Sequence, residues 1–141
     1  MKQQHSTLLR SLLAASLVAL SLLGFGDSAD AQSWPDKPIK LIVPFPAGGG
    51  TDIIAREVAN KVATQEGWTL VVDNKPGSGG NLGVDAAAKS APDGYTIVLG
   101  QTSNLAINPT LYAKLPYNPQ KDLAPIGLVA SSPLVLVVAT D

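Results

Sequence analysis

The chain has 141 residues, and its 10 lysines and arginines against 11 aspartates and glutamates give a net charge of −1 at pH 7. Without an excess of basic residues it lacks the charged patch that nucleic-acid binding needs, so we expect no nucleic-acid partner. It has no cysteine, which excludes disulfides, thiolate metal sites and a cysteine nucleophile.

The chain begins with the features of an export leader. The first ten residues are basic with no acid, and residues 11–26 form a mostly apolar stretch of 16 residues, shorter than the ~20 that span a bilayer. Ala29-Asp30-Ala31 then offers the small-x-small pattern that signal peptidase accepts. We therefore expect a signal peptide over residues 1–31, cleaved after Ala31, a periplasmic location and no stable membrane insertion of the mature chain. The alternative is an uncleaved membrane anchor.

After the leader, apolar runs and glycine-rich breaks predict alternating strands and helices. The strands combine β-branched and apolar residues, and the helices repeat apolar residues at helical spacing. The predicted strands are residues 39–45, 68–72 and 95–99, and the predicted helices are residues 51–66, 81–90 and 109–114. Two apolar runs follow, residues 126–130 and 134–139, the second predicted as a strand. This alternation predicts an α/β fold with a mostly parallel sheet and helices on its faces.

Three polar segments follow the predicted strands and carry the candidate chemistry. The first segment is the glycine-rich break at residues 46–50, the second is the glycine-rich break at residues 75–80, and the third is the polar stretch at residues 100–104. Because the carboxyl ends of parallel strands share one edge of a sheet, we expect the three segments to converge there. Glycine-rich backbone that opens a helix presents unpaired N–H groups beside the positive end of a dipole, which favours an anionic ligand. The alternative is that the glycines only make tight turns.

Asp52 has two interpretations. It lies in the first turn of a predicted helix, where the helix dipole favours an acid, and Thr51 before it is a plausible N-cap. The first interpretation is that the Asp52 side chain caps its own helix. The second is that the carboxylate holds an ammonium group or a bridging water of the ligand.

Enzyme motifs are incomplete in this sequence. Cleavage of the leader removes His5, the only histidine, so the remaining residues offer none for a catalytic triad or a metal site. Ser78 lies in a near match to the serine-hydrolase elbow, but Pro76 occupies the first glycine position. The P-loop is absent, and Leu82 stands where the dinucleotide fingerprint needs its third glycine. We therefore expect no enzyme, no cofactor and no metal.

An ordered set of short motifs is more specific than any single segment. The motifs are Trp34-Pro-x-Lys-Pro-Ile39, Val43-Pro-Phe-Pro-Ala-Gly-Gly-Gly-Thr-Asp52 with Ala55-Arg56, Val72-Asp-Asn-Lys-Pro-Gly-Ser-Gly-Gly-Asn-Leu-Gly83, Pro92-Asp-Gly-Tyr-Thr96, and Asn108-Pro-x-Leu-Tyr112 through Leu115-Pro-Tyr117. Together they resemble the Bug-type periplasmic solute-binding receptors of the tripartite tricarboxylate transporter systems. The resemblance implies a periplasmic-binding-protein-like (type II) fold, whose two lobes close around a small carboxylate and deliver it to membrane permease subunits.

The resemblance also implies a domain division and a set of site residues. Such receptors are longer than this chain, so we expect residues 32–141 to be the first lobe, truncated at the crossover to a missing second lobe. The resemblance implies that the ligand-binding part of the first segment is residues 45–49 with Asp52, that of the second is residues 77–81, and that of the third is residues 101–104, and the three segments are given these bounds from here on. The implied ligand-binding residues are Phe45, Pro46, Ala47, Gly48, Gly49, Asp52, Gly77, Ser78, Gly79, Gly80, Asn81, Gln101, Thr102, Ser103 and Asn104. The alternatives to a transport receptor are a ligand-binding sensory protein on the same fold and a hydrolase that uses Ser78.

Overall fold

The structure is a computed structural model that describes residues 34–133 and 135–139. The predicted signal peptide, with its cleavage site after Ala31, lies outside the described residues. Within the described ranges, no helix is long and apolar enough to cross a membrane.

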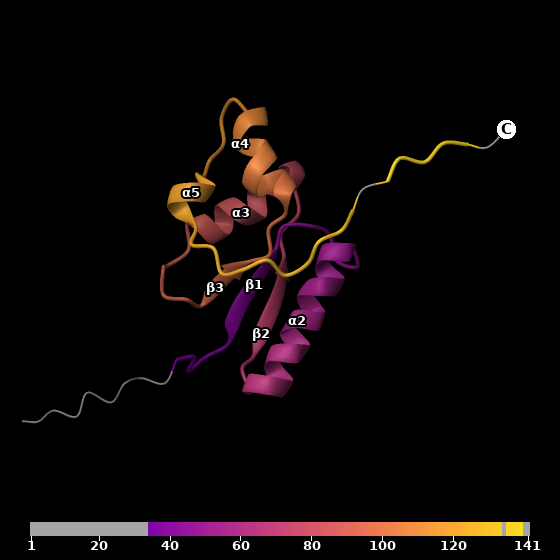
Figure 1. The fold of residues 1–141 in the computed structure, drawn as a ribbon. Helices are drawn as coiled ribbons and strands as arrows, with labels where there is room; N and C mark the ends of the chain where they lie inside the picture. Colours follow the sequence, from indigo (N-terminus) through magenta and orange to yellow (C-terminus); the bar gives the residue numbers. More distant parts are fainter. Residues whose placement is uncertain (1–33, 134, 140–141) are drawn as a thin grey trace, which may run out of the picture. The chain divides into compact units, whose positions relative to one another are not determined.

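Three parallel strands form the sheet of the described chain (Figure 1). They are β1 (Ile39–Val43), β2 (Leu70–Asn74) and β3 (Thr96–Val98), in the order β2-β1-β3. In the register, Ile39 lies opposite Leu70 on one side, and Lys40 lies opposite Thr96 on the other. The parallel sheet and its flanking helices confirm the predicted α/β class.

Helices connect the strands and cover the sheet. In chain order the helical elements are α2 (Gly50–Glu66), the 3-10 turn η1 (Ser78–Gly80), α3 (Asn81–Ala88), the π-helical η2 (Ser103–Ile107), α4 (Asn108–Leu111) and α5 (Pro119–Asp122). α2 joins β1 to β2 and packs against both, whereas α3 joins β2 to β3 and packs against β1 and β3. Each strand therefore leads through a short polar segment into a helix.

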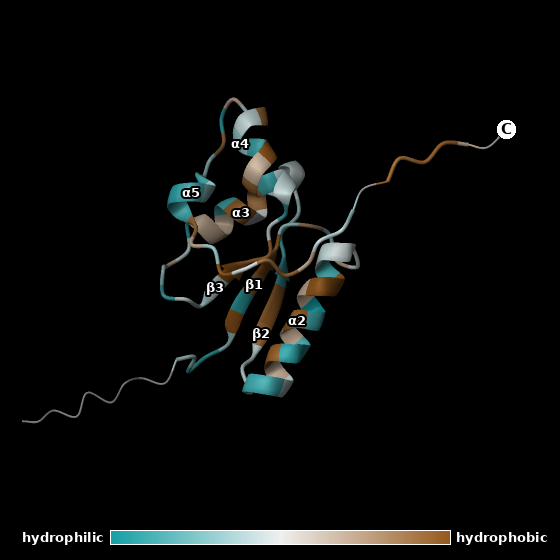
Figure 2. Cartoon of the chain, viewed as in Figure 1, coloured by the Kyte–Doolittle hydropathy of each residue, from teal (hydrophilic) through white to brown (hydrophobic). Residues whose placement is uncertain are grey.

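The core lies between α2 and the sheet. Leu41 and Val43 of β1 pack against Ala55 of α2, and partly buried apolar side chains from the other strands surround them. Figure 2 shows apolar residues concentrated in the strands, while hydrophilic residues alternate with apolar ones along α2. α3 also approaches the sheet closely, because a Cβ at Gly83 would lie 2.6 Å from Pro44 Cβ.

Two strand boundaries differ from the prediction for reasons that the backbone makes clear. β1 ends at Val43 instead of residue 45, because Pro44 has no N–H to donate to a neighbouring strand. β2 is displaced toward the C-terminus, because all five residues of β1 pair with Leu70–Asn74. Asn74 therefore ends a strand and lies opposite Val43.

The residues after α5 form no strand in the described part of the chain. Residues 123–133 and 135–139 have no regular secondary structure, and Leu134 lies outside the described residues. The strand predicted at 134–139 is therefore wrong over residues 135–139. An extended segment becomes a strand only when its backbone bonds to a neighbour, and this one runs away from the sheet (Figure 1), with Leu136 94% exposed.

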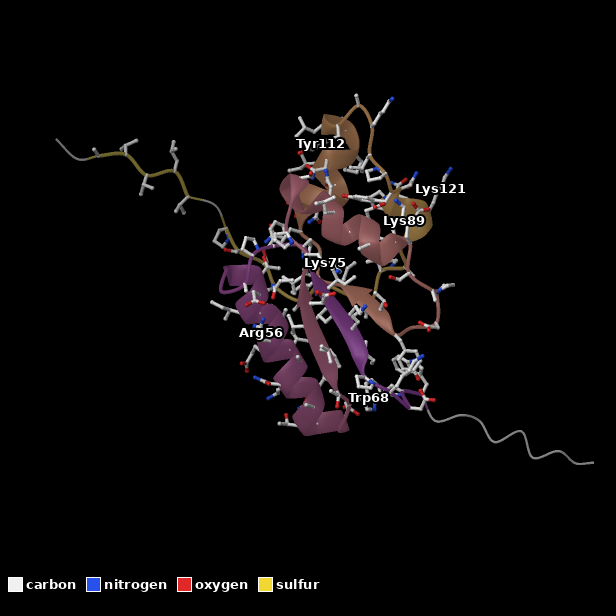
Figure 3. The ribbon with its side chains drawn as sticks, turned by 180° about the vertical axis from the view of Figure 1, so that it is seen from behind. Arg56, Trp68, Lys75, Lys89, Tyr112 and Lys121 are labelled. Carbon is white, nitrogen blue, oxygen red and sulfur yellow. The ribbon has the colours of Figure 1, made fainter. Side chains whose placement is uncertain are left out.

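Aromatic side chains cluster at the amino ends of the strands. Trp34, Trp68 and Tyr95 precede β1, β2 and β3. The ring centroid of Trp34 lies 5.2 Å from that of Trp68 and 6.0 Å from that of Tyr95, and Lys37 Nζ lies 4.1 Å from the centre of the Tyr95 ring. Figure 3 shows Trp68 at the opposite end of the sheet from Lys75, which follows β2. The aromatic cluster and the polar segments therefore occupy opposite ends of the sheet.

Candidate functional site

The three polar segments meet at the carboxyl edge of the sheet, as the sequence predicts. The Gln101 side-chain amide donates a hydrogen bond to the Thr51 hydroxyl, which links the third segment to the start of α2. A Cβ placed on Gly80 would clash with Asn104 Nδ2 and lie 3.3 Å from the Phe45 ring. Gly80 is therefore the point where the second segment touches both of the others.

α2 begins at the first segment without a capping side chain. Gly49 is its N-cap and Gly50 its first residue. The interpretations of Thr51 as N-cap and of Asp52 as a cap for its own helix are therefore wrong. The Ile53 N–H donates to the Gly49 carbonyl at 3.0 Å, so the first-turn amides before it have no intrahelical acceptor. They stand at the positive end of a 17-residue helix, which is a favourable place for an anion.

Asp52 joins the first segment to the body of the lobe. One carboxylate oxygen, Oδ2, accepts from the Gly48 N–H at 2.8 Å and from Arg56 Nε at 2.9 Å, and Oδ1 accepts from Asn74 Nδ2 at 2.9 Å. The side chain is buried. The hydrogen bond from Arg56, with those from Gly48 and Asn74, holds the pKa of Asp52 well below its usual range. An ionised carboxylate thus fixes the glycine turn, and both of its oxygens are already hydrogen-bonded.

The second segment is a tight left-handed turn. Ser78, Gly79 and Gly80 have φ values of 49°, 64° and 89°, a region that favours glycine. The Gly80 N–H donates back to the Gly77 carbonyl at 2.9 Å, and the Asn81 N–H donates to the Ser78 carbonyl. Ser78 and Gly79 are exposed, so they are the part of this turn that solvent can reach.

The third segment is the start of a helical run and not the loop that the sequence predicts. Thr102 is already helical, and Ser103 begins η2. Asn104 is fully buried, and its Oδ1 accepts from the Gln101 N–H at 2.9 Å. Its Nδ2 is buried without a partner among the described residues. The buried Asn104 side chain therefore fills the space beside Gly80 and supports the second segment from the interior of the protein.

A buried polar network holds the second and third segments together. Asn81 Oδ1 lies 2.6 Å from Asn108 Nδ2 and 2.9 Å from the Tyr117 hydroxyl, and that hydroxyl lies 2.6 Å from the Asn104 carbonyl. Asn108 Nδ2 also donates to the Gly79 carbonyl at 3.3 Å. Burial is the largest cause of the raised Tyr117 pKa, so the hydroxyl stays protonated as a donor. Asn108 was not among the predicted ligand-binding residues, although it begins one of the family motifs and lies about one helical turn beyond the third segment.

Burial divides the predicted ligand-binding residues into those that can meet a ligand and those that support them. Pro46, Ala47, Gly48, Gly49, Ser78, Gly79, Gln101 and Thr102 are exposed, Phe45, Gly77 and Ser103 are half-buried, and Asp52, Gly80, Asn81 and Asn104 are buried. Sequence reasoning also missed Asn74, whose side chain contacts the first segment. The available signal was its position as a polar residue between a predicted strand and the glycines of the second segment.

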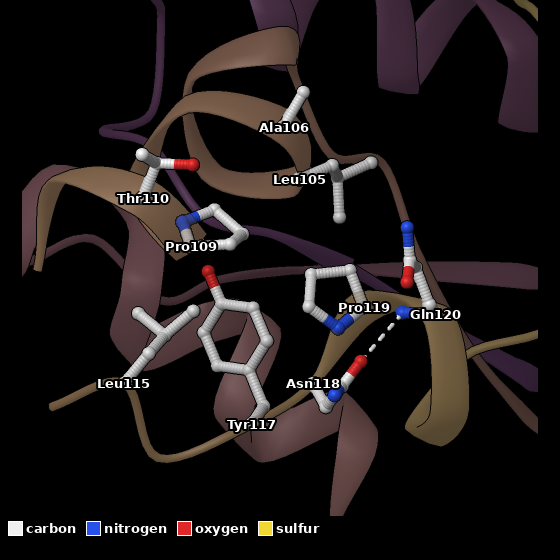
Figure 4. A pocket seen from close by; sticks show the side chains of 9 residues that line it. All are labelled: Leu105, Ala106, Pro109, Thr110, Leu115, Tyr117, Asn118, Pro119 and Gln120. Carbon is white, nitrogen blue, oxygen red and sulfur yellow. Dashed lines mark hydrogen bonds between the residues drawn. The ribbon is translucent and has the colours of Figure 1, made fainter.

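Two cavities are lined by residues outside the three segments. One, of about 450 Å³ and seen in Figure 4, is lined by η2, α4 and the chain around Tyr117 and Pro119. The other, of about 230 Å³, lies between Arg56 of α2 and Val72 of β2. At the carboxyl edge itself, the exposed residues of the three segments are accessible to solvent. No cluster of His, Asp and Glu suited to a metal ion occurs within residues 34–133 and 135–139.

Comparison with known sequences identifies relatives of this chain. The model of the family described as "Tripartite tricarboxylate transporter family receptor" matches residues 54–141. The chain is 42% identical over 127 residues to protein BugT of Bordetella pertussis, a match that covers 89% of this chain and 39% of BugT. The chain thus spans about two fifths of the length of this curated relative.

Solved structures resemble the described fold at similar levels of identity. The periplasmic binding protein BugD is 39% identical with a TM-score of 0.60, over 63% of this chain and 29% of BugD. MatC (Rpa3494) from Rhodopseudomonas palustris, solved with bound malate, is 35% identical with a TM-score of 0.60, over 63% of this chain and 30% of MatC. The match therefore corresponds to a single lobe of a periplasmic-binding-protein fold.

Proposed function

Because this chain belongs to the tripartite tricarboxylate transporter receptor family, we propose that it captures a small carboxylate outside the cytoplasm and delivers it to the membrane permease of a tripartite transporter. The observation that carries the proposal is the convergence of three polar segments at one edge of a parallel sheet. MatC, a structural neighbour, was solved with bound malate, which supports a dicarboxylate as the ligand class.

The chemistry of the edge suits a carboxylate held mainly by the backbone. The amides of the first turn of α2 and the exposed backbone of Ser78 and Gly79 are the proposed donors, assisted by the positive end of the α2 dipole. The Arg56 guanidinium is bonded to Asp52 and Asn74, so recognition in this proposal does not depend on an arginine clamp. The protein binds and releases its ligand without catalysis.

The location outside the cytoplasm requires export. We propose that residues 1–31 act as a cleaved signal peptide, on the sequence evidence of a basic start, an apolar stretch and a small-x-small end. The chain is similar to the periplasmic binding protein BugD, and this supports the periplasm as the site of function.

Calorimetric titration of the full-length protein with malate, succinate and citrate tests the proposal, with Gly79→Val as the site variant. A valine at φ 64° is strained, and its side chain would start 3.5 Å from both Asn108 Nδ2 and the Tyr112 hydroxyl. We expect at least a tenfold loss of affinity, about 1.4 kcal/mol.

Gly67→Val is the matched control. Gly67 has a similar φ of 72°, lies at the C-terminal end of α2, and has open space where a Cβ would stand. It therefore carries the same backbone strain away from the three segments and leaves affinity unchanged. If the folded Gly79→Val variant binds as tightly as the wild type, the second segment is only a turn. If the wild type binds none of the three acids, the proposed function is wrong.

A further inference from the structure

We propose that Asn74 is a positioning residue for the ligand, because its side chain fixes the first segment in the shape that the ligand meets. The inference rests on the proposed function, since it assigns a role toward the same ligand. Asn74 is the last residue of β2 and lies opposite Val43 of β1. It therefore stands beside the point where the first segment leaves the sheet.

The Asn74 amide bonds to the first segment in two places. Its Nδ2 donates to the Phe45 carbonyl at 3.1 Å and to Asp52 Oδ1 at 2.9 Å. Its Oδ1 accepts from Arg56 Nη2 at 3.2 Å. Both ends of the segment, the exit from β1 and the first turn of α2, are thus tied to one side chain on the neighbouring strand.

Asp52 passes this restraint on to the glycine turn. Its other oxygen accepts a hydrogen bond from the Gly48 N–H at 2.8 Å. Gly48 has a φ of 79°, and because glycine can adopt several backbone conformations, this bond selects one of them. Asn74 therefore orients Asp52, and Asp52 orients Gly48. Only a side chain with both a donor and an acceptor can bond Asp52 and Arg56 at once.

The atoms that bond to the Asn74 side chain are polar groups of the first segment and α2, and none belongs to an apolar side chain of the core. The core forms around Leu41, Val43 and Ala55, and the Asn74 side chain makes its bonds outside that cluster. Loss of the amide therefore frees the segment and leaves the sheet in place. Loss of the Asn74 amide therefore changes ligand affinity more than it changes the free energy of unfolding.

Replacing Asn74 by aspartate tests this role through the pH dependence of malate binding. Asn74→Asp has nearly the same shape, but it removes the Nδ2 donor and places a second carboxylate beside Asp52. Two carboxylates that share a site raise the pKa of one of them, so the pair takes up a proton as the pH falls and a donor between them is restored. The other charged groups at this place are Arg56, which faces both positions, and the flanking pair Asp73 and Lys75, 3.3 Å apart.

We expect Asn74→Asp in the full-length protein to bind malate about tenfold more weakly than wild type at pH 8, and about threefold more weakly at pH 5.5. Dividing the Kd of the variant by the Kd of the wild type at each pH cancels the effect of the ionisation of malate itself. Gln65→Glu, the same amide-to-carboxylate change at an exposed position near the other end of α2, leaves the ratio near one at every pH. A ratio near one for Asn74→Asp at pH 8, or a loss that is identical at both pH values, overturns the inference.

Hydrogen exchange separates this inference from the proposed function and needs no ligand. In Asn74→Ala the Gly48 amide should exchange at least tenfold faster than in the wild type, because Asp52 is no longer oriented toward it, while the amide of Ile42 within β1 keeps its rate. An unchanged Gly48 rate refutes the positioning role even if malate binds. If the wild type binds no carboxylate, the proposed function is refuted. The exchange rate of the Gly48 amide then still tests whether Asn74 restrains the first segment.

Discussion

Gly83→Ala tests how closely α3 packs on the sheet that carries the site. The added Cβ would lie 2.6 Å from Pro44 Cβ, 2.7 Å from Pro44 Cα and 2.9 Å from the Lys75 carbonyl oxygen. Two of these three atoms belong to the backbone at the ends of β1 and β2, which cannot rotate away as a side chain can. The helix must therefore move outward, and the second segment, which leads into it, moves as well.

The expected cost follows from two opposing effects. Overpacking a close contact costs about 1–3 kcal/mol, and the rigid backbone neighbours place this case at about 3 kcal/mol. Alanine is a better helix former than glycine by about 1 kcal/mol, which offsets part of that cost. We therefore expect Gly83→Ala to lower the free energy of unfolding by about 2 kcal/mol.

Urea unfolding of the full-length protein, followed by circular dichroism, measures this difference. Gly50→Ala is the matched control, because Gly50 is also in a helix and a Cβ there meets nothing within 4 Å. The control has the helix-propensity gain without the clash, so it should raise the unfolding free energy by up to about 1 kcal/mol. If Gly83→Ala is as stable as the wild type, the close approach of α3 to Pro44 is refuted.

Two further predictions concern acid stability and export. The folded pKa of Asp52 lies below its ordinary value of 3.8, so its ionised bonds add stability that is present above that value and is lost as the pH falls below it. Asp52→Asn should therefore have a lower free energy of unfolding in urea than the wild type at pH 7, and that free energy should fall less between pH 5 and pH 2. An equal fall in the variant and the wild type would contradict this role of Asp52. Mass spectrometry of the periplasmic fraction should give a mature chain that begins at Gln32, and an intact Met1 there would contradict cleavage after Ala31.

The order of strands and helices was predictable because each break in the pattern has a local cause. A proline after an apolar run and glycines before an amphipathic run stop and start elements through their own backbone chemistry. The convergence of the three segments follows from the parallel topology alone. These features depend on neighbours in sequence, which the sequence displays directly.

The details that the sequence did not predict depend on neighbours in space. Asp52 looks like a helix cap by its position, but Asn74, 22 residues away, and Gly48 take its oxygens. The third segment looks like a loop by composition, yet the bond from the Gln101 N–H to Asn104 Oδ1 turns it into the start of a helix. Such polar pairs carry no periodic pattern, so only the folded chain reveals them.

The position of the aromatic cluster decides which optical signal can follow ligand binding. Both tryptophans of the chain, Trp34 and Trp68, lie in that cluster at the amino ends of the strands, whereas the proposed ligand meets the carboxyl ends. Their intrinsic fluorescence should therefore report the loosening of the first strand and its neighbours, and stay nearly silent when malate binds. A fluorophore attached beside the second segment would be the appropriate sensor.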